Sequence, residues 1–523
     1  MGTTEINLHL ENEKEKLVGF ARGCNHIYLY GAGNIARAIL DILEDEGIRP
    51  TALVVSSPVN REKYGYQVIS SQEASEIIKN NDGIIPAFTG AVAGDISERL
   101  YPATPQMHLI NHLDILALDD ELRFGPVMNE LRERFGVAEK DYKLEEIHRI
   151  LVVRLDLIGD MVFTTPFLRE LRSNFEKAHI TLIVRPQNYS IVKGCPHVSE
   201  ILTYDCPFQQ GELSRQCENY DEIKQRVENF SLENFSEKKY DAVFFPRELL
   251  SGRNVVDELL LGFYSEAKIR IGRQLNLNEI YGDHLLEQVS DSFSLISHHD
   301  MVLHESQYAL QMLRDIGCTI INQRMELYVS EDDRKRAMEK VQDNGDGKTK
   351  VALGIAASVP QRMWPAESYI ELIGLLNTKY PDHFVFLLFG GEDAIDAAKT
   401  IKNGLDDNIS KFLLDFVGKQ SLNESVALMG YCNLYVGSNT GLLHFASAEN
   451  IPSVTIYSEL SDGKPTDGDA PERMGAWMVP HVDLVPPAGL DGCHGVCRMH
   501  FPHCIKLITP KMVMRAVEEL LNL

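Results

Sequence analysis

One pattern recurs three times along this chain of 523 residues and limits how it can fold: a short apolar run, a turn that contains glycine, and a stretch with helical periodicity. The three blocks open near His26, Ile150 and Val351. Alternating strands and helices form parallel sheets with helices on both faces. The sequence therefore predicts an α/β fold whose ligands bind beyond the carboxyl ends of the strands.

The predicted domains follow these blocks. We expect a Rossmann-like accessory domain over residues 1–118, a charged helical connector over 119–147, and two further Rossmann-like domains over 148–342 and 343–523. The last boundary rests on the segment 343–348, where two glycines beside Asp and Asn indicate a flexible turn or hinge. Strands are expected at residues 26–30, 52–55, 150–154, 180–184, 201–204, 242–245, 269–271, 351–354, 384–389, 434–436 and 453–457, and the last helix at 510–521.

The charge of the chain excludes some partners. There are 51 basic and 76 acidic side chains, which give a net charge of −25. This charge repels nucleic acid and anionic lipid at long range, so we expect no nucleic-acid partner and at most peripheral membrane contact. The start of the chain has no apolar core after a basic segment, and no apolar run approaches the ~18–20 residues that cross a bilayer. A cytoplasmic protein with reduced thiols is the expectation.

Asp160 is the first candidate for chemistry. It follows the strand 150–154 and lies in a glycine turn that leads into a helix. A carboxylate at the carboxyl end of a strand can act as a general base. The alternative is a turn or capping Asp, which is common at such positions.

The third block holds the candidates for binding a ligand. Arg362, between Ser358 and Trp364, follows a strand and can hold a diphosphate, or it is a solvated Arg beside a packing Trp. The turn 438–441 with His444 offers free backbone N–H groups to an anion at a helix N-terminus. After the strand 384–389, Glu392 can accept hydrogen bonds from a ribose, or it only favours the start of a helix.

The first block contains a dinucleotide-binding fingerprint. Gly31, Gly33 and Ala36 fit the pattern G-x-G-x-x-G/A after a strand. The acidic residue expected at the end of the second strand is missing, because Val55 is followed by Ser56. We therefore expect a Rossmann-like domain that binds another nucleotide or serves as a docking scaffold, rather than an NAD site.

Three cysteines lie close together near the end of the chain. They are Cys493, Cys497 and Cys504, with His500 and His503 between them. Their spacing matches no standard zinc pattern. It is compatible with a small metal-bound loop or with reduced structural cysteines.

From about Ile150 to Leu523 the chain resembles glycosyltransferase family 9, the heptosyltransferase family. The motifs that carry the resemblance are spread over this span in the order of the family. They are ILVVRLDLIGDMVFTTPFLRELR, KYDAVFFPR, AKIRIGR, SVPQRMWPAESYIELI and FVGKQSLNESVALMGYCNLYVGSNTGLLHFASAENIPSVTIY. The resemblance implies a GT-B fold, in which two Rossmann-like domains face each other across a cleft. It also implies inverting, metal-independent sugar transfer from a nucleotide diphosphate, with no cofactor required.

The resemblance assigns roles to the candidates. Asp160 is the implied catalytic base. Arg362, which takes the place of a Lys, and its neighbours Ser358 and Trp364 belong to the implied donor site. Thr440 and Gly441 cradle phosphate with His444 nearby, Glu392 contacts the ribose, and Asn439 stands where the family usually has Asp.

The implied substrates also follow from the resemblance. The donor is a nucleotide-diphosphate sugar, with heptose as the family default. The acceptor is a glycan or glycolipid in bacterial cell-surface, lipopolysaccharide-like biosynthesis, met at the inner face of the membrane.

Three alternatives stay open. The N-terminal fingerprint keeps open the hypothesis of an NAD-dependent oxidoreductase or epimerase. Asn439 keeps open the hypothesis of a non-catalytic protein that binds nucleotide sugar. The C-terminal cysteines are similar to the cysteine finger of bacterial autotransporter heptosyltransferases, which binds iron, and this leaves a protein-directed heptosyltransferase.

Overall fold

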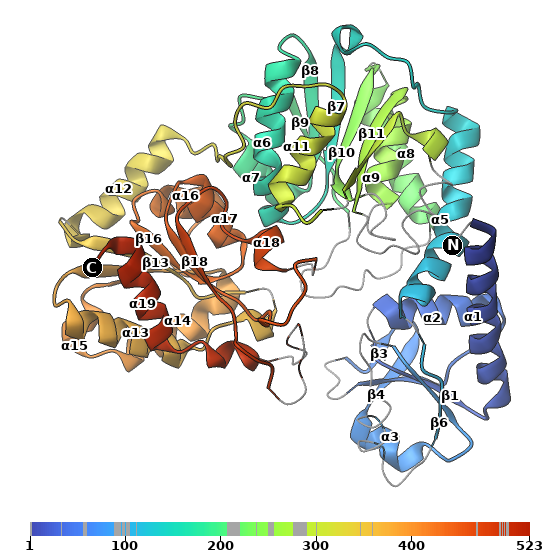
Figure 1. Cartoon of the computed structure of the whole chain (residues 1–523), viewed down its shortest axis with the longest axis horizontal. Coiled ribbons are helices and arrows are strands. Elements are labelled where there is room, and N and C mark those ends of the chain that lie inside the picture. The colour runs from blue at the N-terminus through green and yellow to red at the C-terminus, as the bar shows by residue number, and fades with distance from the viewer. Residues whose placement is uncertain are drawn as a thin grey trace.

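The computed structural model contains three six-stranded sheets with helices packed around them, within the residues that it describes (Figure 1). The predicted α/β class is thus confirmed. We call the three units the N-terminal, central and C-terminal domains. The structure describes residues 3–523 apart from 33, 56–59, 88–95, 97–99, 101–104, 111, 207–219, 237, 249–255, 276–289, 300, 346, 358, 467–468, 491–492, 494, 496 and 498–500.

The N-terminal domain has the strand order β3-β4-β2-β1-β5-β6. Its pairs are parallel except β3 with β4, which is antiparallel. Its buried strands are short apolar runs, as expected for a sheet covered on both faces. The elements are α1 (Thr3–Gly23), β1 (Ile27–Tyr30), α2 (Asn34–Asp45), β2 (Ala52–Val55), β3 (Glu62–Lys63), β4 (Tyr66–Ser70), α3 (Ser71–Ile77), β5 (Gly83–Pro86) and β6 (Gln106–Met107).

Helix α5 (His112–Phe135) joins the N-terminal and central domains. Ile115 and Leu118 of its first half are buried in the core of the N-terminal domain. Val127 and Leu131 of its second half are buried in the core of the central domain. The predicted helical connector therefore exists, but the helix begins at 112 rather than 119 and its residues complete two separate cores.

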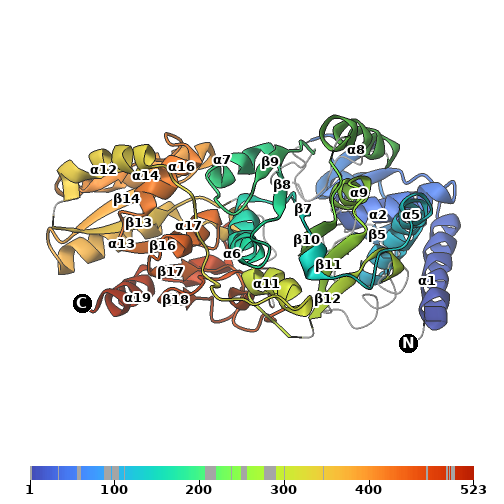
Figure 2. The ribbon, with the colours of Figure 1, turned by 90° about the horizontal axis from the view of Figure 1, so that it is seen from above.

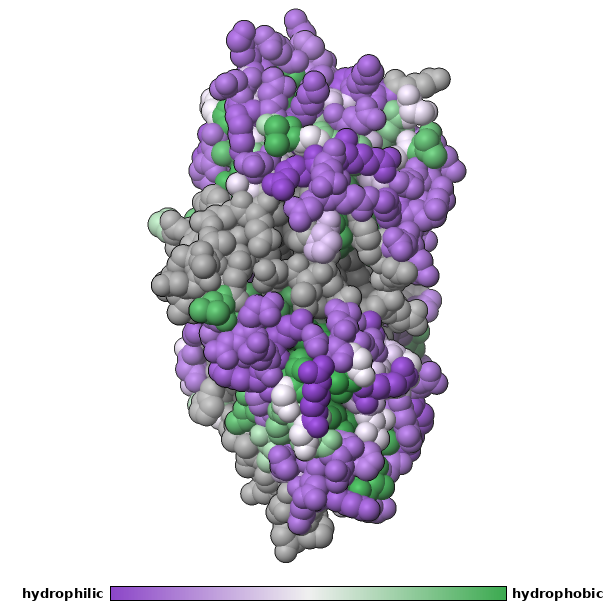
Figure 3. Space-filling model, turned by 90° about the vertical axis from the view of Figure 1, so that its right-hand side faces the viewer, coloured by the Kyte–Doolittle hydropathy of each residue, from purple (hydrophilic) through white to green (hydrophobic). Residues whose placement is uncertain are grey.

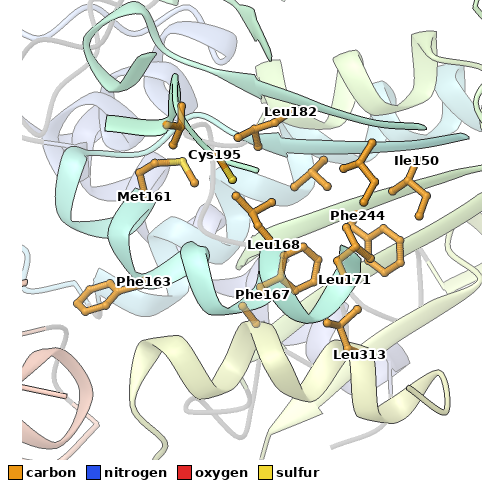
Figure 4. Packing of buried hydrophobic residues seen from close by; sticks show 14 of the residues in the cluster. Ile150, Met161, Phe163, Phe167, Leu168, Leu171, Leu182, Cys195, Phe244 and Leu313 are labelled. Atoms are coloured by element: carbon orange, nitrogen blue, oxygen red, sulfur yellow. The ribbon is translucent and has the colours of Figure 1, made fainter. Parts of the chain in front are cut away.

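The central domain is a parallel sheet in the order β12-β11-β10-β7-β8-β9. Apolar side chains of β7, β8 and β10 pack against α6 and α11 (Figure 4). Phe163 stands apart from the other labelled side chains, at the end of α6 that faces the C-terminal domain. The elements are β7 (Arg149–Arg154), α6 (Ile158–Asn174), β8 (His179–Val184), α7 (Tyr189–Val192), β9 (Glu200–Thr203), α8 (Tyr220–Phe235), β10 (Ala242–Glu248), α9 (Val256–Tyr264), β11 (Ile269–Leu275), β12 (Leu295–His299) and α11 (Glu305–Asp315).

The C-terminal domain repeats the plan, in the order β15-β14-β13-β16-β17-β18, with parallel pairs. Every strand predicted in this domain is present, and so is the predicted last helix. The elements are α12 (Glu331–Gly345), β13 (Thr349–Gly354), α13 (Ala366–Lys379), β14 (Phe384–Phe389), α14 (Ile395–Gly404), α15 (Asp407–Ser410), β15 (Leu413–Asp415), α16 (Leu422–Met429), β16 (Leu434–Ser438), α17 (Gly441–Ala448), β17 (Ser453–Ile456), α18 (Pro471–Met474), β18 (His481–Leu484) and α19 (Pro510–Leu521).

The chain crosses into this domain earlier than the boundary placed at 343. Helix α12 lies against the C-terminal domain, beside α16 (Figure 2). Its Ala337 and Val341 are buried in the core of that domain. The crossing segment is therefore 316–330, and the glycine turn at 343–348 only joins α12 to β13 inside one domain.

The surface agrees with the composition. On the face shown in Figure 3, hydrophilic side chains predominate and apolar ones form small separate groups. Among the described helices, none combines the length and the apolar character that crossing a membrane requires.

Candidate active site between the central and C-terminal domains

Asp160 lies at the carboxyl end of the central strand β7. The strand is buried, and α6 begins four residues after it. Asp160 is in the first turn of α6, where its carboxylate accepts a hydrogen bond from the backbone N–H of Leu157 at 3.2 Å. Its side chain is 27% exposed, and the guanidinium of Arg154 lies 3.6 Å from its Oδ1. The carboxylate is therefore held in place and still open to a substrate.

The surroundings of Asp160 adjust its protonation. Burial raises the pKa of this carboxyl to about 6, and the nearby Asp156 adds to the rise, while the charge of Arg154 opposes it. A carboxylate with a pKa just below neutral is ionised at pH 7 and accepts a proton more readily than an ordinary Asp. This is the protonation behaviour that a general base needs.

A buried network of charges fixes this corner of the central domain. Arg154 Nε lies 3.0 Å from Asp156, and Arg247 Nε lies 2.8 Å from the same carboxylate. Glu258 accepts the backbone N–H of Leu155 at 2.8 Å. Burial raises the pKa of Glu258 to about 7, with Arg247 opposing the rise. The sequence did not point to this network, since Arg247 and Glu258 lie over 90 positions from their partners Asp156 and Leu155.

The same network reaches the other domain through Glu305. This carboxylate pairs with Arg273 of β11 and lies 3.7 Å from Arg473 of α18. Although burial opposes it, the charges of Arg273, Arg154 and Arg473 lower the pKa of Glu305. Two arginines from the central domain and one from the C-terminal domain thus converge on one carboxylate.

The N-terminus of α17 lies against the N-terminus of α6. A Cβ placed on Gly159 would lie 2.9 Å from Cδ2 of His444 and 3.9 Å from Cα of Gly441. Only a glycine at 159 permits this approach without a shift. The free N–H groups and the positive dipole ends of both helices therefore face the same region, and such ends attract anions.

The turn before α17 places three further candidates here. Asn439 is buried and follows β16, Thr440 is the N-cap of α17, and Gly441 begins the helix. His444 lies one turn later, with its ring 4.2 Å from that of Phe163 on α6. Burial lowers the pKa of His444 to about 3, with a smaller effect of His304, so its imidazole is neutral.

A stack of rings also holds the two domains together. His304, just before α11, stacks on Trp477 with ring centroids 4.3 Å apart. Its Nε2 donates a hydrogen bond to the carbonyl oxygen of Gly475 at 3.1 Å. The indole N–H of Trp477 donates to the carbonyl oxygen of Gln323 at 2.7 Å, in the crossing segment.

Arg362 ends the short 3-10 helix Pro360–Arg362 beside the turn of α17. Its carbonyl oxygen accepts a hydrogen bond from the hydroxyl of Ser438 at 2.5 Å. Its guanidinium pairs with Asp469. Burial lowers the pKa of Arg362, against the opposing charge of Glu459. The cation is thus half-buried next to the anion-attracting turn.

Other predicted donor-site residues have different surroundings. Trp364 is buried in the domain core, and its indole N–H donates to the carbonyl oxygen of Ile508 at 2.9 Å. Trp364 therefore has a packing role instead of the expected contact with the sugar donor. Its ring is packed in the core, and its indole N–H already makes a hydrogen bond. Glu392 is exposed in the 3-10 helix Glu392–Ala394 after β14. Ser358 lies outside the described residues.

In the N-terminal fingerprint, Gly31 has φ of 130°, and a Cβ there would lie 2.7 Å from the carbonyl oxygen of Ala87. Glycine is thus required for close backbone packing at the end of β1. Ala36 is buried in the core under the sheet. Gly33, and the residues after β2 where an acid was sought, lie outside the described part of the chain.

The structure brings Cys493, Cys497 and Cys504 together and adds His503 to them. One potential ligand atom of each lies within 4.8 Å of those of the others. The sequence grouped these residues but did not choose between His500 and His503, because the spacing matches no standard metal motif.

Comparisons with known proteins agree with this fold. Residues 295–467 match the sequence model of glycosyltransferase family 9 (heptosyltransferase). The resemblance to glycosyltransferase family 9 is confirmed over these residues. They begin at β12 and do not include Asp160.

Two sequence relatives are heptosyltransferases. The chain is 30% identical over 102 residues to lipooligosaccharide heptosyltransferase 2 of Haemophilus influenzae, which is 20% of this chain and 29% of that protein. It therefore spans less than a third of that relative. It is 23% identical over 322 residues to lipopolysaccharide heptosyltransferase 2 of Escherichia coli K12, which is 60% of this chain and 83% of that protein.

Solved structures show the same fold. A glycosyltransferase of family 9 from Veillonella parvula superposes with a TM-score of 0.55 and 19% identity, over 74% of this chain and 99% of that one. The ADP-heptose lipopolysaccharide heptosyltransferase II of E. coli superposes with a TM-score of 0.51 and 17% identity, over 72% and 98%. The predicted GT-B arrangement of Rossmann-like domains is thus confirmed, with the N-terminal domain as an addition.

Proposed function

We propose that the protein is an inverting, metal-independent glycosyltransferase. It moves a sugar, heptose by family default, from a nucleotide-diphosphate sugar to a saccharide acceptor. The acceptor belongs to a bacterial cell-surface glycan of the lipopolysaccharide type, met at the cytoplasmic face of the membrane. One observation carries the proposal: the carboxylate of Asp160 stands in the first turn of α6, and Gly159 beside it lies against the N-terminus of α17.

In this reaction Asp160 takes the proton of the acceptor hydroxyl. The hydroxyl oxygen then attacks the anomeric carbon from the side opposite the diphosphate, and the bond from that carbon to the diphosphate breaks. Attack from the opposite side inverts the configuration at the carbon. The raised pKa of Asp160 favours the proton transfer, and Arg154 at 3.6 Å keeps the carboxylate oriented.

The departing diphosphate needs positive charge. The N-terminus of α17, with Thr440 and Gly441, offers backbone N–H groups to it. Arg362 adds a cation that can grip two phosphate oxygens at once, after it exchanges Asp469 for the phosphate. The neutral His444 packs against Phe163 and thereby sets the distance between the two domains.

The remaining donor contacts are assigned by the family pattern. Glu392 lies beyond the end of β14, where the nucleoside ribose is expected, and Asn439 follows β16 in the turn before α17. Asn439 cannot carry the charge of the Asp that the family usually has, so it recognises the donor by hydrogen bonds alone.

The test uses the purified full chain and a panel of nucleotide-diphosphate sugars. Asp160→Asn should keep donor affinity and lose turnover by roughly 10²–10⁴, the usual contribution of a general base. Asp333→Asn is the matched control, since Asp333 also lies in the first turn of a helix, α12, and is remote from the site. Both variants should fold, and only the first should lose activity.

The contrary outcomes are distinct. Wild-type turnover in Asp160→Asn would remove Asp160 from the reaction. Binding of a nucleotide sugar without any turnover by the wild type would point to a non-catalytic binding protein. Oxidation or epimerisation of a substrate with NAD would place the activity in the N-terminal domain. Transfer to a polypeptide acceptor would identify a protein-directed enzyme.

A further inference from the structure

The four-residue cluster at the end of the chain is built by three segments that meet. Gly495 adopts φ of 69° between Cys493 and Cys497, and this left-handed turn brings the two thiols to the same side. A Cβ on Gly489 would collide with the carbonyl oxygen of Cys493, so the backbone at Gly489 runs close to that at Cys493. His503 and Cys504 then enter from the segment that precedes α19.

The third segment comes from the end of β17. Leu460 packs against the three cysteines, and its backbone N–H donates to the carbonyl oxygen of Gly495 at 2.8 Å. Asp462 accepts the backbone N–H of Gly495 at 3.0 Å. The four side chains of the cluster thus lie where the backbone around Gly495 meets the backbone that follows β17.

The distances between His503 and the three cysteines fit the tetrahedral coordination of a metal ion. Nδ1 of His503 lies 3.9 Å from Sγ of Cys493, 3.7 Å from Sγ of Cys497 and 3.3 Å from Sγ of Cys504. With zinc bonds of about 2.3 Å to sulfur and 2.0–2.1 Å to nitrogen at tetrahedral angles, the expected separation of sulfur and nitrogen is about 3.6 Å. The three observed distances lie on either side of this value.

The chemistry of the four groups agrees with the distances. All four side chains are buried, and the three cysteines are free of disulfide bonds. The backbone N–H of Leu490 donates to Sγ of Cys504 at 3.4 Å, the kind of outer hydrogen bond that orients a metal-bound thiolate. Three thiolates and one imidazole are a structural zinc set.

We propose that Cys493, Cys497, His503 and Cys504 form a closed structural zinc site. The ligand from the histidine is Nδ1. Four protein ligands fill the tetrahedron, so no position is open for a substrate, and the ion takes no part in sugar transfer. Its role is to hold the four ligand residues beside the backbone that follows β17, and it is independent of the proposed enzymatic function.

Elemental analysis of the full chain, purified without chelator, tests the site. We expect about one zinc ion per chain, as a single four-ligand site requires. Cys497→Ser and His503→Gln should lose the zinc. Cys432→Ser is the matched control, because Cys432 is a buried cysteine of the same domain outside the cluster, and it should keep the zinc.

A second measurement does not depend on the folding of a variant. X-ray absorption at the zinc edge of the wild type should show three sulfur atoms at about 2.3 Å from the zinc and one nitrogen atom at about 2.0–2.1 Å. These are the bond lengths typical of this ligand set. Removing the zinc with a chelator should lower the melting temperature, and adding zinc should restore it.

Four results would overturn the proposal. A chain that holds no metal and takes up none from a zinc solution has no site. Iron in stoichiometric amount refutes the choice of zinc. Equal zinc content in Cys497→Ser and Cys432→Ser places the ion elsewhere. A disulfide between two of the three cysteines in the freshly purified protein excludes the thiolate set.

Discussion

The contact between Gly159 and His444 predicts the effect of a single methyl group. In Gly159→Ala the new Cβ would lie 2.9 Å from Cδ2 of His444. Carbon atoms in contact prefer about 3.5–4.0 Å, so the two domains must move apart by about 0.6–1 Å. A misplacement of about 1 Å can cost 10²-fold in rate, and we expect turnover to fall by about 10- to 100-fold.

The fold itself should tolerate this change. Position 159 lies in the first turn of α6, and alanine favours a helix over glycine by up to about 1 kcal/mol. The free energy of unfolding, measured in urea, should therefore stay within about 1 kcal/mol of the wild type. Loss of rate without loss of stability separates a defect of domain approach from a defect of folding.

A second glycine serves as the control. Gly374 lies in α13, and a Cβ there would meet no atom within 4 Å. Gly374→Ala should leave the initial rate of sugar transfer unchanged and raise stability slightly. Wild-type rates in Gly159→Ala would refute the reasoning, because they would show that the close approach of α6 and α17 does not set the geometry of the reaction.

Four other perturbations have defined outcomes. The turnover rate should rise with pH through about 6, because Asp160 acts as a base only when it is ionised, and a rise near pH 4 in the pH–rate profile would contradict the raised pKa. The same raised pKa makes the ionised carboxylate costly in the folded state, so Asp160→Asn should add about 1–3 kcal/mol of stability at pH 8 and nothing below about pH 4, which urea unfolding at both pH values would check. Asp469→Ala should tighten the binding of a nucleoside diphosphate, since it frees Arg362, and calorimetry that shows unchanged affinity would remove the ion pair from the binding step. Arg270→Ala leaves three backbone carbonyl oxygens without their donor and should lower the free energy of unfolding by about 3 kcal/mol; a loss well under 1 kcal/mol in thermal or urea unfolding would show that water replaces the guanidinium.

The sheets could be predicted because their strands are continuous apolar runs. In a parallel sheet covered on both faces, a strand such as 384–389 is buried throughout, and a local pattern suffices to find it. The boundary at 343 failed for the opposite reason. Helix α12 is mostly charged and contributes only a few apolar side chains to the core, while the glycine turn after it is conspicuous in the sequence.

Candidate site residues could be named from the sequence only where they follow strands. Asp160 lies six residues after the end of β7 and the turn 438–441 lies at the end of β16. Each parallel sheet gathers the carboxyl ends of its own strands at one edge, where ligands bind. The partners of these groups were not predictable in this way. Glu305 meets Arg473 across two domains, and Trp364 turns into the core, because such contacts depend on long-range packing that no local pattern records.

Helix α5 has a consequence for how the molecule unfolds. Pro126 lies inside the helix, between the half that fills the N-terminal core and the half that fills the central core. Neither core is complete without its half, and the two halves are one continuous element. The N-terminal and central domains therefore share a cooperative unit. A denaturant that unfolds one of them also removes buried side chains from the core of the other. A truncation that discards the first domain must keep the second half of α5, or the central domain loses Val127 and Leu131 from its interior.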